Sequence, residues 1–143
     1  MPDQDTLASA TLLAHQMDRF TRRMEAGIHQ RAEPVDVDRV GPLGGMALLA
    51  LHEIEPAPIQ SLVAMMRRDK SQMTRLIQML ERKGYVERHA CATDGRVSLM
   101  RLSDKGRDFV GAMQAIMADV IGDLLKPLDP QEREQLTQML QKI

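Results

Sequence analysis

The chain has 143 residues and a formal net charge of −1, with 43% hydrophobic and 27% charged residues. These values fit one globular domain with or without a dimerisation element, and they exclude a bulk attraction of the whole molecule to nucleic acid. No apolar run reaches the roughly 18 residues of a membrane span, and the acidic start, Met1 to Asp5, lacks the apolar segment of a secretory signal. The single cysteine, Cys91, excludes an internal disulfide. We therefore expect a cytoplasmic protein without membrane contact.

A long helix is predicted at the start of the chain and a second one after a loop. Apolar residues in Leu13–Ile28 recur at steps of 4, 3, 4 and 4, which predicts one apolar stripe on a helix over about 5–30. Breakers and acids predict a loop over 33–38. The second helix opens at Gly41 and ends before Pro56, because proline disfavours helix at the residue preceding it.

Two further helices follow in close succession. The first is predicted over 59–66, and the second runs from Asp69 to about Lys83. Asp69 is a favourable N-cap, and Gln72, three residues later, completes the sequence pattern of a capping box. Gly84 then occupies the position after the last turn that glycine favours.

A β-hairpin and two helices complete the predicted order. Short strands are expected over 85–91 and 97–102, because the Asp94-Gly95 pair separates two extended segments. Ser103 is the expected N-cap of a long helix, and a second capping-box pattern starts the last helix at Asp129. Three helices followed by a hairpin predict a mainly α fold with a small β-hairpin wing, the winged helix-turn-helix.

The ends and the centre of the chain differ in apolar pattern and in charge. Helices over 1–32 and 103–143 carry more apolar surface than a small core buries, so we expect a helical dimerisation region there and a homodimer. The winged helix-turn-helix lobe is expected over 41–102. Residues 57–107 hold eleven basic and five acidic residues, a net of +6, against −7 for the rest. This split indicates a local DNA footprint, although solvated helix faces also produce it.

Four central segments together form a known pattern, namely 69–77 (DKSQMTRLI), 80–88 (LERKGYVER), Asp94-Gly95-Arg96 and 102–107 (LSDKGR). In order and spacing they resemble the MarR family of transcriptional regulators, and the resemblance covers about 41–107. The first segment resembles that family's recognition helix, and the second resembles the exit from that helix into the wing. The third matches its acidic-x-Arg wing-tip motif, and the fourth resembles the start of its long dimer helix.

The resemblance and the side chains together indicate contacts with double-stranded DNA. A helix N-terminus in the major groove brings short polar and basic side chains to base edges and phosphates. Gln72 can pair with adenine and Arg75 with guanine, while Arg96 at the hairpin tip can enter a minor groove. The resemblance implies that Asp94 holds Arg96 by an ion pair. The expected contacts on the recognition helix are Lys70, Ser71, Gln72, Thr74 and Arg75. An ordinary exposed helix start and a plain turn are the competing interpretations.

Two positions depart from the family's pattern. Arg67 and Arg68 stand where the family usually has a small and then an apolar residue, so they either add phosphate contacts or give the turn a different shape. Gly95 replaces a second basic residue often found in the family's wing, and we expect this wing to bind the DNA backbone less strongly.

The resemblance also implies a pocket for a small aromatic or amphipathic effector. MarR-like proteins commonly bind such molecules between the dimer helices and the DNA-binding lobe, and binding shifts the spacing of the two recognition helices. The expected lining residues are Met17, Phe20, Met24, Met46 and Leu49. Ordinary core packing is the competing interpretation for the methionines.

No catalytic residue, metal site or cofactor is predicted. The four histidines, His15, His29, His52 and His89, do not follow ligand spacings such as H-x-x-x-H. Basic neighbours favour a thiolate at Cys91 and leave a redox switch open, but a small half-buried residue is the favoured interpretation. We expect a homodimeric DNA-binding repressor on a pseudo-palindromic operator, and not an enzyme. The alternative is a winged-helix protein-interaction module without DNA binding.

Overall fold

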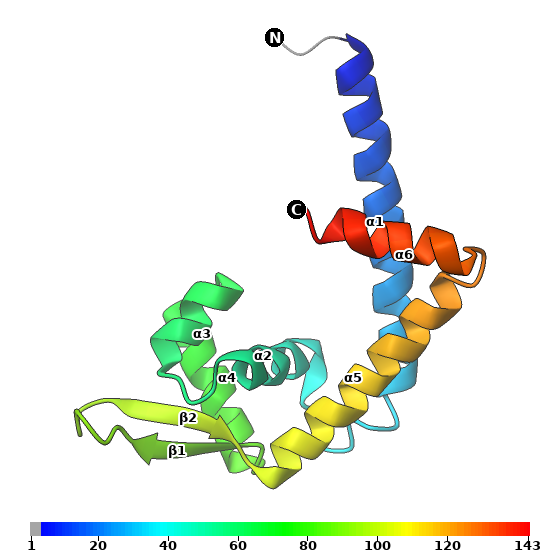
Figure 1. Cartoon of the computed structure of the whole chain (residues 1–143). Helices are drawn as coiled ribbons and strands as arrows, with labels where there is room; N and C mark the ends of the chain where they lie inside the picture. Colours follow the sequence, from blue (N-terminus) through cyan, green and yellow to red (C-terminus); the bar gives the residue numbers. More distant parts are fainter. Residues whose placement is uncertain (1–3) are drawn as a thin grey trace. The chain divides into compact units, whose positions relative to one another are not determined.

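The structure is a computed structural model that describes residues 4–143, so the first three residues of the predicted 1–32 region lie outside it. Figure 1 shows a mainly helical chain with one two-stranded antiparallel hairpin, which confirms the predicted fold class. None of the helices in 4–143 is long and apolar enough to cross a membrane. The elements are α1 (Gln4–Ala32), α2 (Gly41–Ile54), α3 (Ile59–Met66), α4 (Lys70–Arg82), β1 (Val86–Ala90), β2 (Ser98–Leu102), α5 (Asp104–Leu124) and α6 (Pro130–Leu140).

The chain divides into two compact units. The helical unit combines the chain up to Arg31 with Ile116–Ile143, and the winged unit is Ala32–Ala115. The division falls inside α5, because the first turns of that helix pack into the core of the winged unit. The dimerisation role expected for 1–32 and 103–143 stays a prediction.

The core of the winged unit is made by one face of each element. On α4 the buried side chains are Met73, Ile77 and Leu80, which share one face of the helix. Tyr85 and Phe109 meet edge to face with their ring centroids 5.5 Å apart, which joins the hairpin to α5. No polar or charged residue is buried in the described chain. The largest fully buried side chains are Leu48, Leu51, Leu62, Met73, Ile77, Leu80, Met100 and Val110.

Helices α5 and α6 both begin at the predicted capping residues. The Ser103 hydroxyl accepts a hydrogen bond from the Gly106 backbone N–H at 3.0 Å. Asp129 and Glu132 form a complete capping box, with both reciprocal bonds at 2.8 Å. Both caps satisfy backbone N–H groups that a helix start leaves without partners, so these two boundaries were predictable from short segments.

The hairpin is confirmed, with shorter strands and a longer loop than the sequence predicts. β1 and β2 pair in the register Val86 opposite Leu102 to Ala90 opposite Ser98. The loop over 91–97 ends in a turn in which the Val97 N–H donates to the Asp94 carbonyl at 3.0 Å. Gly95 does not adopt the positive φ that a two-residue Asp-Gly turn requires, so the chain forms this wider loop instead.

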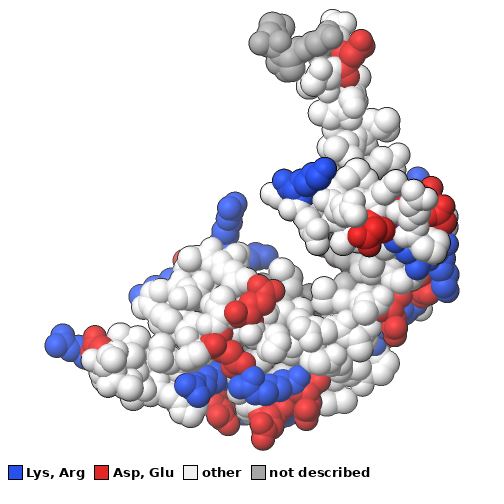
Figure 2. Space-filling view, viewed as in Figure 1, with Lys and Arg blue, Asp and Glu red and all other residues white. Residues whose placement is uncertain are grey.

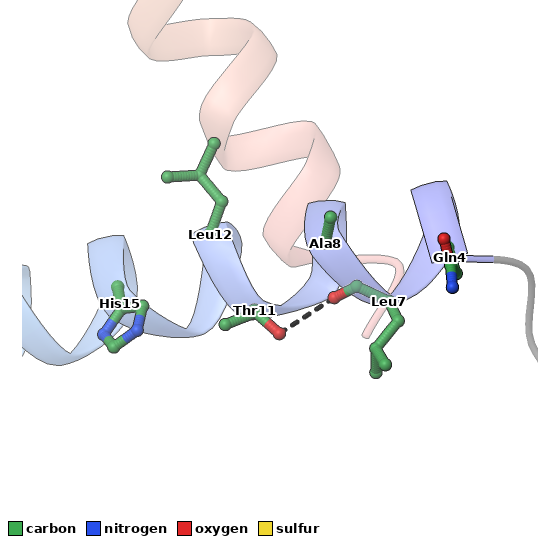
Figure 3. A pocket seen from close by; sticks show the side chains of 6 residues that line it. All are labelled: Gln4, Leu7, Ala8, Thr11, Leu12 and His15. Atoms are coloured by element: carbon green, nitrogen blue, oxygen red, sulfur yellow. Dashed lines mark hydrogen bonds between the residues drawn. The ribbon is translucent and has the colours of Figure 1, made fainter.

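The helical unit contains close contacts and an exposed apolar face. A Cβ at Gly27 would lie 2.9 Å from Cγ1 of Val120, so α1 and α5 approach closely there. Asp123 pairs with Lys126 and with Arg31, and the bond from Lys126 first, then that from Arg31, lower the pKa of its carboxyl to about 2. No residue of α1 is buried. Figure 3 shows a shallow hollow along α1 lined by Gln4, Leu7, Ala8, Thr11, Leu12 and His15.

Candidate nucleic-acid interface

The exposed surface of α4 begins at a side-chain cap. The Asp69 carboxylate accepts a hydrogen bond from the Gln72 backbone N–H at 3.1 Å, which confirms the predicted N-cap. The reciprocal bond from the Gln72 side chain is absent among the hydrogen bonds of the described chain, so only half of the capping box forms. The Gln72 amide is therefore available to another partner.

The structure places four of the five predicted contacts of α4 on its exposed surface. Lys70, Ser71, Gln72 and Arg75 are exposed, whereas Thr74 is half-buried. The Thr74 hydroxyl donates to the Lys70 carbonyl within the helix at 2.8 Å. That bond uses the only proton of the hydroxyl, so Thr74 can act toward a partner only as an acceptor.

Sequence reasoning missed two exposed side chains on the same face of α4. Gln78 and Arg82 continue the row begun by Ser71 and Arg75, at steps of 4, 3 and 4. At about 1.5 Å of rise per residue, Gln78 lies about 10 Å and Arg82 about 16 Å along the axis from Ser71. Extending the helical spacing beyond Arg75 would have identified both residues.

The turn between α3 and α4 exposes two arginines. Arg67 caps α3 in the left-handed conformation, with φ 49° and ψ 45°, and its backbone N–H donates to the Val63 carbonyl. A non-glycine residue seldom adopts this conformation. Arg67 and Arg68 are both exposed, so their guanidinium groups extend the basic surface beside the start of α4.

The hairpin tip carries an extended arginine. The Arg96 side chain is 95% exposed, and its Nε lies 4.0 Å from the Asp94 carboxylate. The same carboxylate accepts from the Arg96 backbone N–H at 3.1 Å. Asp94 thus holds the backbone of the turn more closely than it holds the guanidinium group. Figure 2 shows basic side chains projecting at the wing tip and on the α3 side of the winged unit.

Cys91 lies at the start of this loop. Its Sγ is 3.3 Å from the Thr93 hydroxyl oxygen. Hydrogen bonds from that hydroxyl, and then from the backbone N–H groups of Thr93 and Asp94, lower the pKa of the thiol. The basic neighbours expected to have this effect are occupied elsewhere, because Arg88 binds Glu81 and His89 lies 3.4 Å from Glu87.

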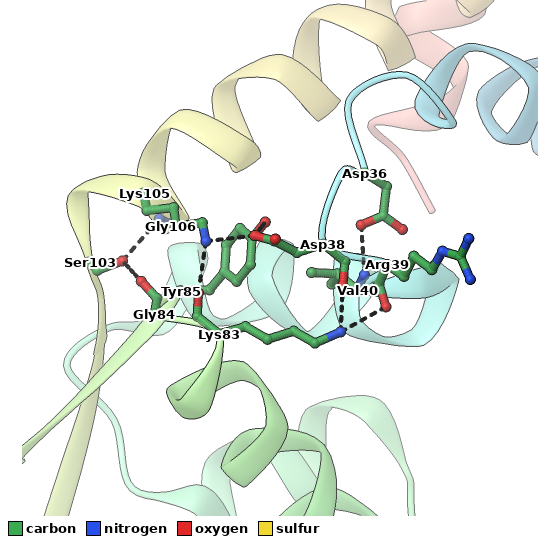
Figure 4. A network of polar contacts seen from close by, with 10 residues as sticks. All are labelled: Asp36, Asp38, Arg39, Val40, Lys83, Gly84, Tyr85, Ser103, Lys105 and Gly106. Atoms are coloured by element: carbon green, nitrogen blue, oxygen red, sulfur yellow. Dashed lines mark hydrogen bonds and ion pairs between the residues drawn. The ribbon is translucent and has the colours of Figure 1, made fainter.

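A polar network at the base of the winged unit joins four segments of the chain (Figure 4). The Tyr85 hydroxyl donates to the Asp38 carboxylate at 2.8 Å, and Lys105 pairs with the same carboxylate at 2.5 Å while lying 4.5 Å from the Tyr85 ring centroid. Lys83 donates to the carbonyls of Asp38 and Arg39. The network ties the loop before α2 to the end of α4, the start of β1 and the start of α5.

The titration of Tyr85 tests this network, because it is the only tyrosine in the chain. Burial first, and then the hydrogen bond to Asp38, raise the pKa of Tyr85 to about 12. A raised folded pKa means that the phenol stabilises the fold below pH ~10 and that this contribution is lost as the pH rises toward the folded value. We expect tyrosinate absorbance to appear near pH 12 in the folded protein and near pH ~10 in denaturant.

The matched control for this titration is Asp38→Asn, which keeps Tyr85 buried but removes the carboxylate. We expect its tyrosine pKa to lie between the denatured and wild-type values. Circular dichroism recorded at each pH shows whether the chain is still folded. Ionisation of a fully folded wild-type protein at the denatured value would contradict the network.

The winged unit matches a known family model. The model of the MarR family matches residues 45–98, from within α2 to the start of β2. This segment is a MarR family domain. The segment contains α4 and most of the β1–β2 hairpin, the elements on which the resemblance depends, and the predicted resemblance is confirmed.

Several solved structures share the fold over nearly the whole chain. A MarR family protein from Bacillus stearothermophilus matches with a TM-score of 0.84 and 20% identity, covering 99% of this chain and 95% of that chain. Apo MarR from E. coli matches with a TM-score of 0.75 and 21% identity, covering 91% and 94%. A mutant MepR from S. aureus, bound to an oligodeoxyribonucleotide, matches with a TM-score of 0.64 and 23% identity, covering 91% and 94%.

The predicted effector residues belong to different units. Met17, Phe20 and Met24 lie on α1 in the helical unit, whereas Met46 and Leu49 lie on α2 of the MarR domain. Met17 and Met46 are 55% and 56% exposed, so they are not packed in the core of either unit. In residues 4–143 no three His, Cys, Asp or Glu side chains group as a metal site would require.

Proposed function

We propose that this protein is a transcriptional regulator that binds double-stranded DNA. The observation that carries the proposal is the pairing of two exposed elements in the winged unit, the polar face of α4 and the 95% exposed Arg96. The α4 face is suited to base edges in a major groove, and the Arg96 guanidinium is suited to a minor groove. Residues 57–107 carry a local net charge of +6, which favours binding of a polyanion although the net charge of the whole chain is −1.

Different tasks are proposed for the residues of the exposed row of α4, which is Ser71, Arg75, Gln78 and Arg82. Ser71 to Gln78 spans about 10 Å along the helix axis, and in the proposed complex Arg75 and Gln78 face base edges of the major groove. Arg82 lies about 16 Å along the axis from Ser71, near the other end of the helix, and is suited to a backbone phosphate. Arg67 and Arg68, beside the start of the helix, add phosphate contacts on the other strand.

Two relatives support the DNA-binding proposal. A mutant MarR from E. coli complexed with operator DNA shares the fold, with a TM-score of 0.72, 20% identity and coverage of 99% of this chain and 98% of that chain. The DNA-bound MepR described above is a second case. Besides this similarity of fold, the exposed residues of α4 and the wing in this chain support the proposal.

The proposed regulator is a homodimer. The helical unit leaves Leu7, Leu12 and Leu13 of α1 and Met139 and Leu140 of α6 largely exposed. Such apolar faces favour burial against a second copy, and a twofold dimer places two α4 helices on successive major grooves about 10 bp apart. Occupation of a pseudo-palindromic operator would repress transcription, and an aromatic or amphipathic effector at Met17, Phe20, Met24, Met46 and Leu49 would release it.

Selection of DNA from a randomised duplex pool by the purified protein tests the proposal. We expect enrichment of a pseudo-palindrome, and an affinity that falls steeply with salt because phosphate contacts release counterions. A protein that enriches no sequence and binds no duplex would overturn DNA binding and would favour the protein-interaction module.

The selected duplex then tests the role of Arg75. We expect Arg75→Ala to cost about 1–3 kcal/mol of binding free energy per protomer and to relax the preference at one base position. Lys142→Ala removes the same charge from the helical unit and serves as the control. Equal affinity of the Arg75 variant and the wild type in a fluorescence anisotropy titration would remove Arg75 from the interface.

A further inference from the structure

Glu81 and Arg88 form a two-bonded ion pair between the recognition helix and the wing. Arg88 Nε donates to Oε1 of Glu81 at 2.8 Å, and Nη2 donates to Oε2 at 3.0 Å. The two side chains are 25% and 40% exposed, respectively. Bidentate pairs of this kind fix orientation as well as distance. Glu81 lies in the last turn of α4, and Arg88 is the third residue of β1.

The ion pair lies at one cross-strand residue pair of the hairpin, Arg88 opposite Met100, which is called the rung below. Met100 and Ala57 exchange two backbone hydrogen bonds, at 2.8 and 3.2 Å, which tie β2 to the connection between α2 and α3. Both strands are therefore anchored at this rung, β2 through its backbone and β1 through the Arg88 side chain.

Beyond this rung the wing has no further polar anchor to the helices. Within the described chain, the hydrogen bonds of residues 89–99 all remain inside the hairpin, as in Cys91 N–H to the Val97 carbonyl at 2.9 Å. Arg96 lies four residues from Met100, a reach of up to about 13 Å in extended chain. A rotation of about 10° at the rung therefore displaces the tip by about 2 Å.

We propose that Glu81 and Arg88 are positioning residues that set the angle of the wing relative to α4. Their pairing brings Arg96 to the minor groove while α4 occupies the neighbouring major groove, and Arg88 does not itself bind DNA. Glu81 is the only acidic residue of α4, and an acid on a recognition helix repels phosphates. The inference rests on the proposed function, since it concerns how two DNA-contacting elements are held together.

Glu81→Gln distinguishes positioning from simple electrostatics by the sign of its effect. Removing one negative charge per protomer strengthens DNA binding if charge alone matters. Loss of the ion pair weakens binding if the wing must be positioned, and we expect the affinity for the duplex selected by the wild type to fall about tenfold. Glu87→Gln is the matched control, because Glu87 lies on the same hairpin, is exposed, and makes its one ion pair in the described chain with His89 of the same strand. We expect its affinity to be equal to or higher than that of the wild type.

A double-mutant cycle measures whether the affinity lost with Arg96→Ala depends on Glu81. It would not depend on Glu81 if the ion pair only stabilised the fold. Arg96→Ala is expected to lose several-fold less affinity in the Glu81→Gln background than in the wild type, because an unanchored wing already contributes less. The charge exchange Glu81→Arg with Arg88→Glu restores the pair and is expected to recover part of the affinity. Thermal unfolding verifies that each variant is folded.

The outcomes separate this inference from the proposed function. If the wild type binds DNA but Glu81→Gln binds as tightly as Glu87→Gln, or if Arg96→Ala costs the same factor in both backgrounds, the positioning role is wrong and the proposed function stands. If the wild type binds no duplex, both fall together. Weaker binding by Glu81→Gln together with a reduced cost of Arg96→Ala supports the positioning role.

Discussion

Replacing Gly106 with alanine is expected to lower the free energy of unfolding by about 3 kcal/mol. A Cβ at this position would lie 2.2 Å from the Tyr85 carbonyl oxygen and 3.3 Å from Cδ2 of Leu102. The Tyr85 carbonyl cannot easily move away, because it accepts the Ser103 backbone N–H at 3.0 Å. The added methyl group must therefore separate the start of α5 from the start of the hairpin. A loss of this size is a large part of the stability of an ordinary domain.

Gly111→Ala is the matched control for the Gly106 variant. Gly111 lies in the same helix and in the winged unit, but a Cβ there meets no atom within 4 Å. Because alanine favours helix over glycine, we expect Gly111→Ala to raise the stability by up to about 1 kcal/mol. Denaturant unfolding of both variants measures the difference. Similar stability of the two variants would contradict the close contact at Gly106.

Replacing Arg96 with alanine is expected to weaken binding to the selected duplex by about tenfold to a hundredfold. The side chain is 95% exposed at the hairpin tip and its Nε lies 4.0 Å from the Asp94 carboxylate, so its removal leaves the fold intact and removes this contact and those with a partner. A guanidinium group in a minor groove gains most where A·T-rich sequence narrows the groove. The loss should therefore be larger on a duplex with A·T-rich steps at the wing site than on one with G·C steps.

Arg96→Lys separates charge from shape at the same position. Lysine keeps the positive charge but lacks the planar group, so we expect a smaller loss and a reduced preference for A·T steps. Fluorescence anisotropy at several salt concentrations measures affinity and its salt slope together. If Arg96→Ala binds both duplexes as tightly as the wild type, the wing tip does not contact DNA.

Local features of the fold were predictable from short stretches of sequence. The cap at Asp69, the cap at Ser103 and the capping box at Asp129 depend on bonds between residues three positions apart. Gly84 takes the expected positive φ of 80° after α4. These capping signals depend only on residues that are close in sequence, so they can be recognised without knowing the rest of the fold.

The candidate site was predictable only in part. The exposure of Lys70, Ser71, Gln72 and Arg75 agrees with the helical spacing, and extending that spacing would have added Gln78 and Arg82. Their contacts with DNA stay predictions, as do the dimerisation regions and the effector residues. The prediction that basic neighbours favour the thiolate of Cys91 was wrong about the cause of its lowered pKa. The sequence does not reveal which of these neighbouring side chains already have partners.

By itself, the sequence determined the order of elements, the helix boundaries and the presence of a wing, because these depend on periodicity and on caps within a few residues. Only the tertiary structure decided which distant groups meet. Asp38 reaches Tyr85 across 47 positions, and Gly106 packs against the Tyr85 carbonyl. The Glu81–Arg88 pair depends on the turn of the chain at Gly84. These contacts depend on how whole helices and strands pack together, and that packing cannot be deduced from any single segment of the sequence.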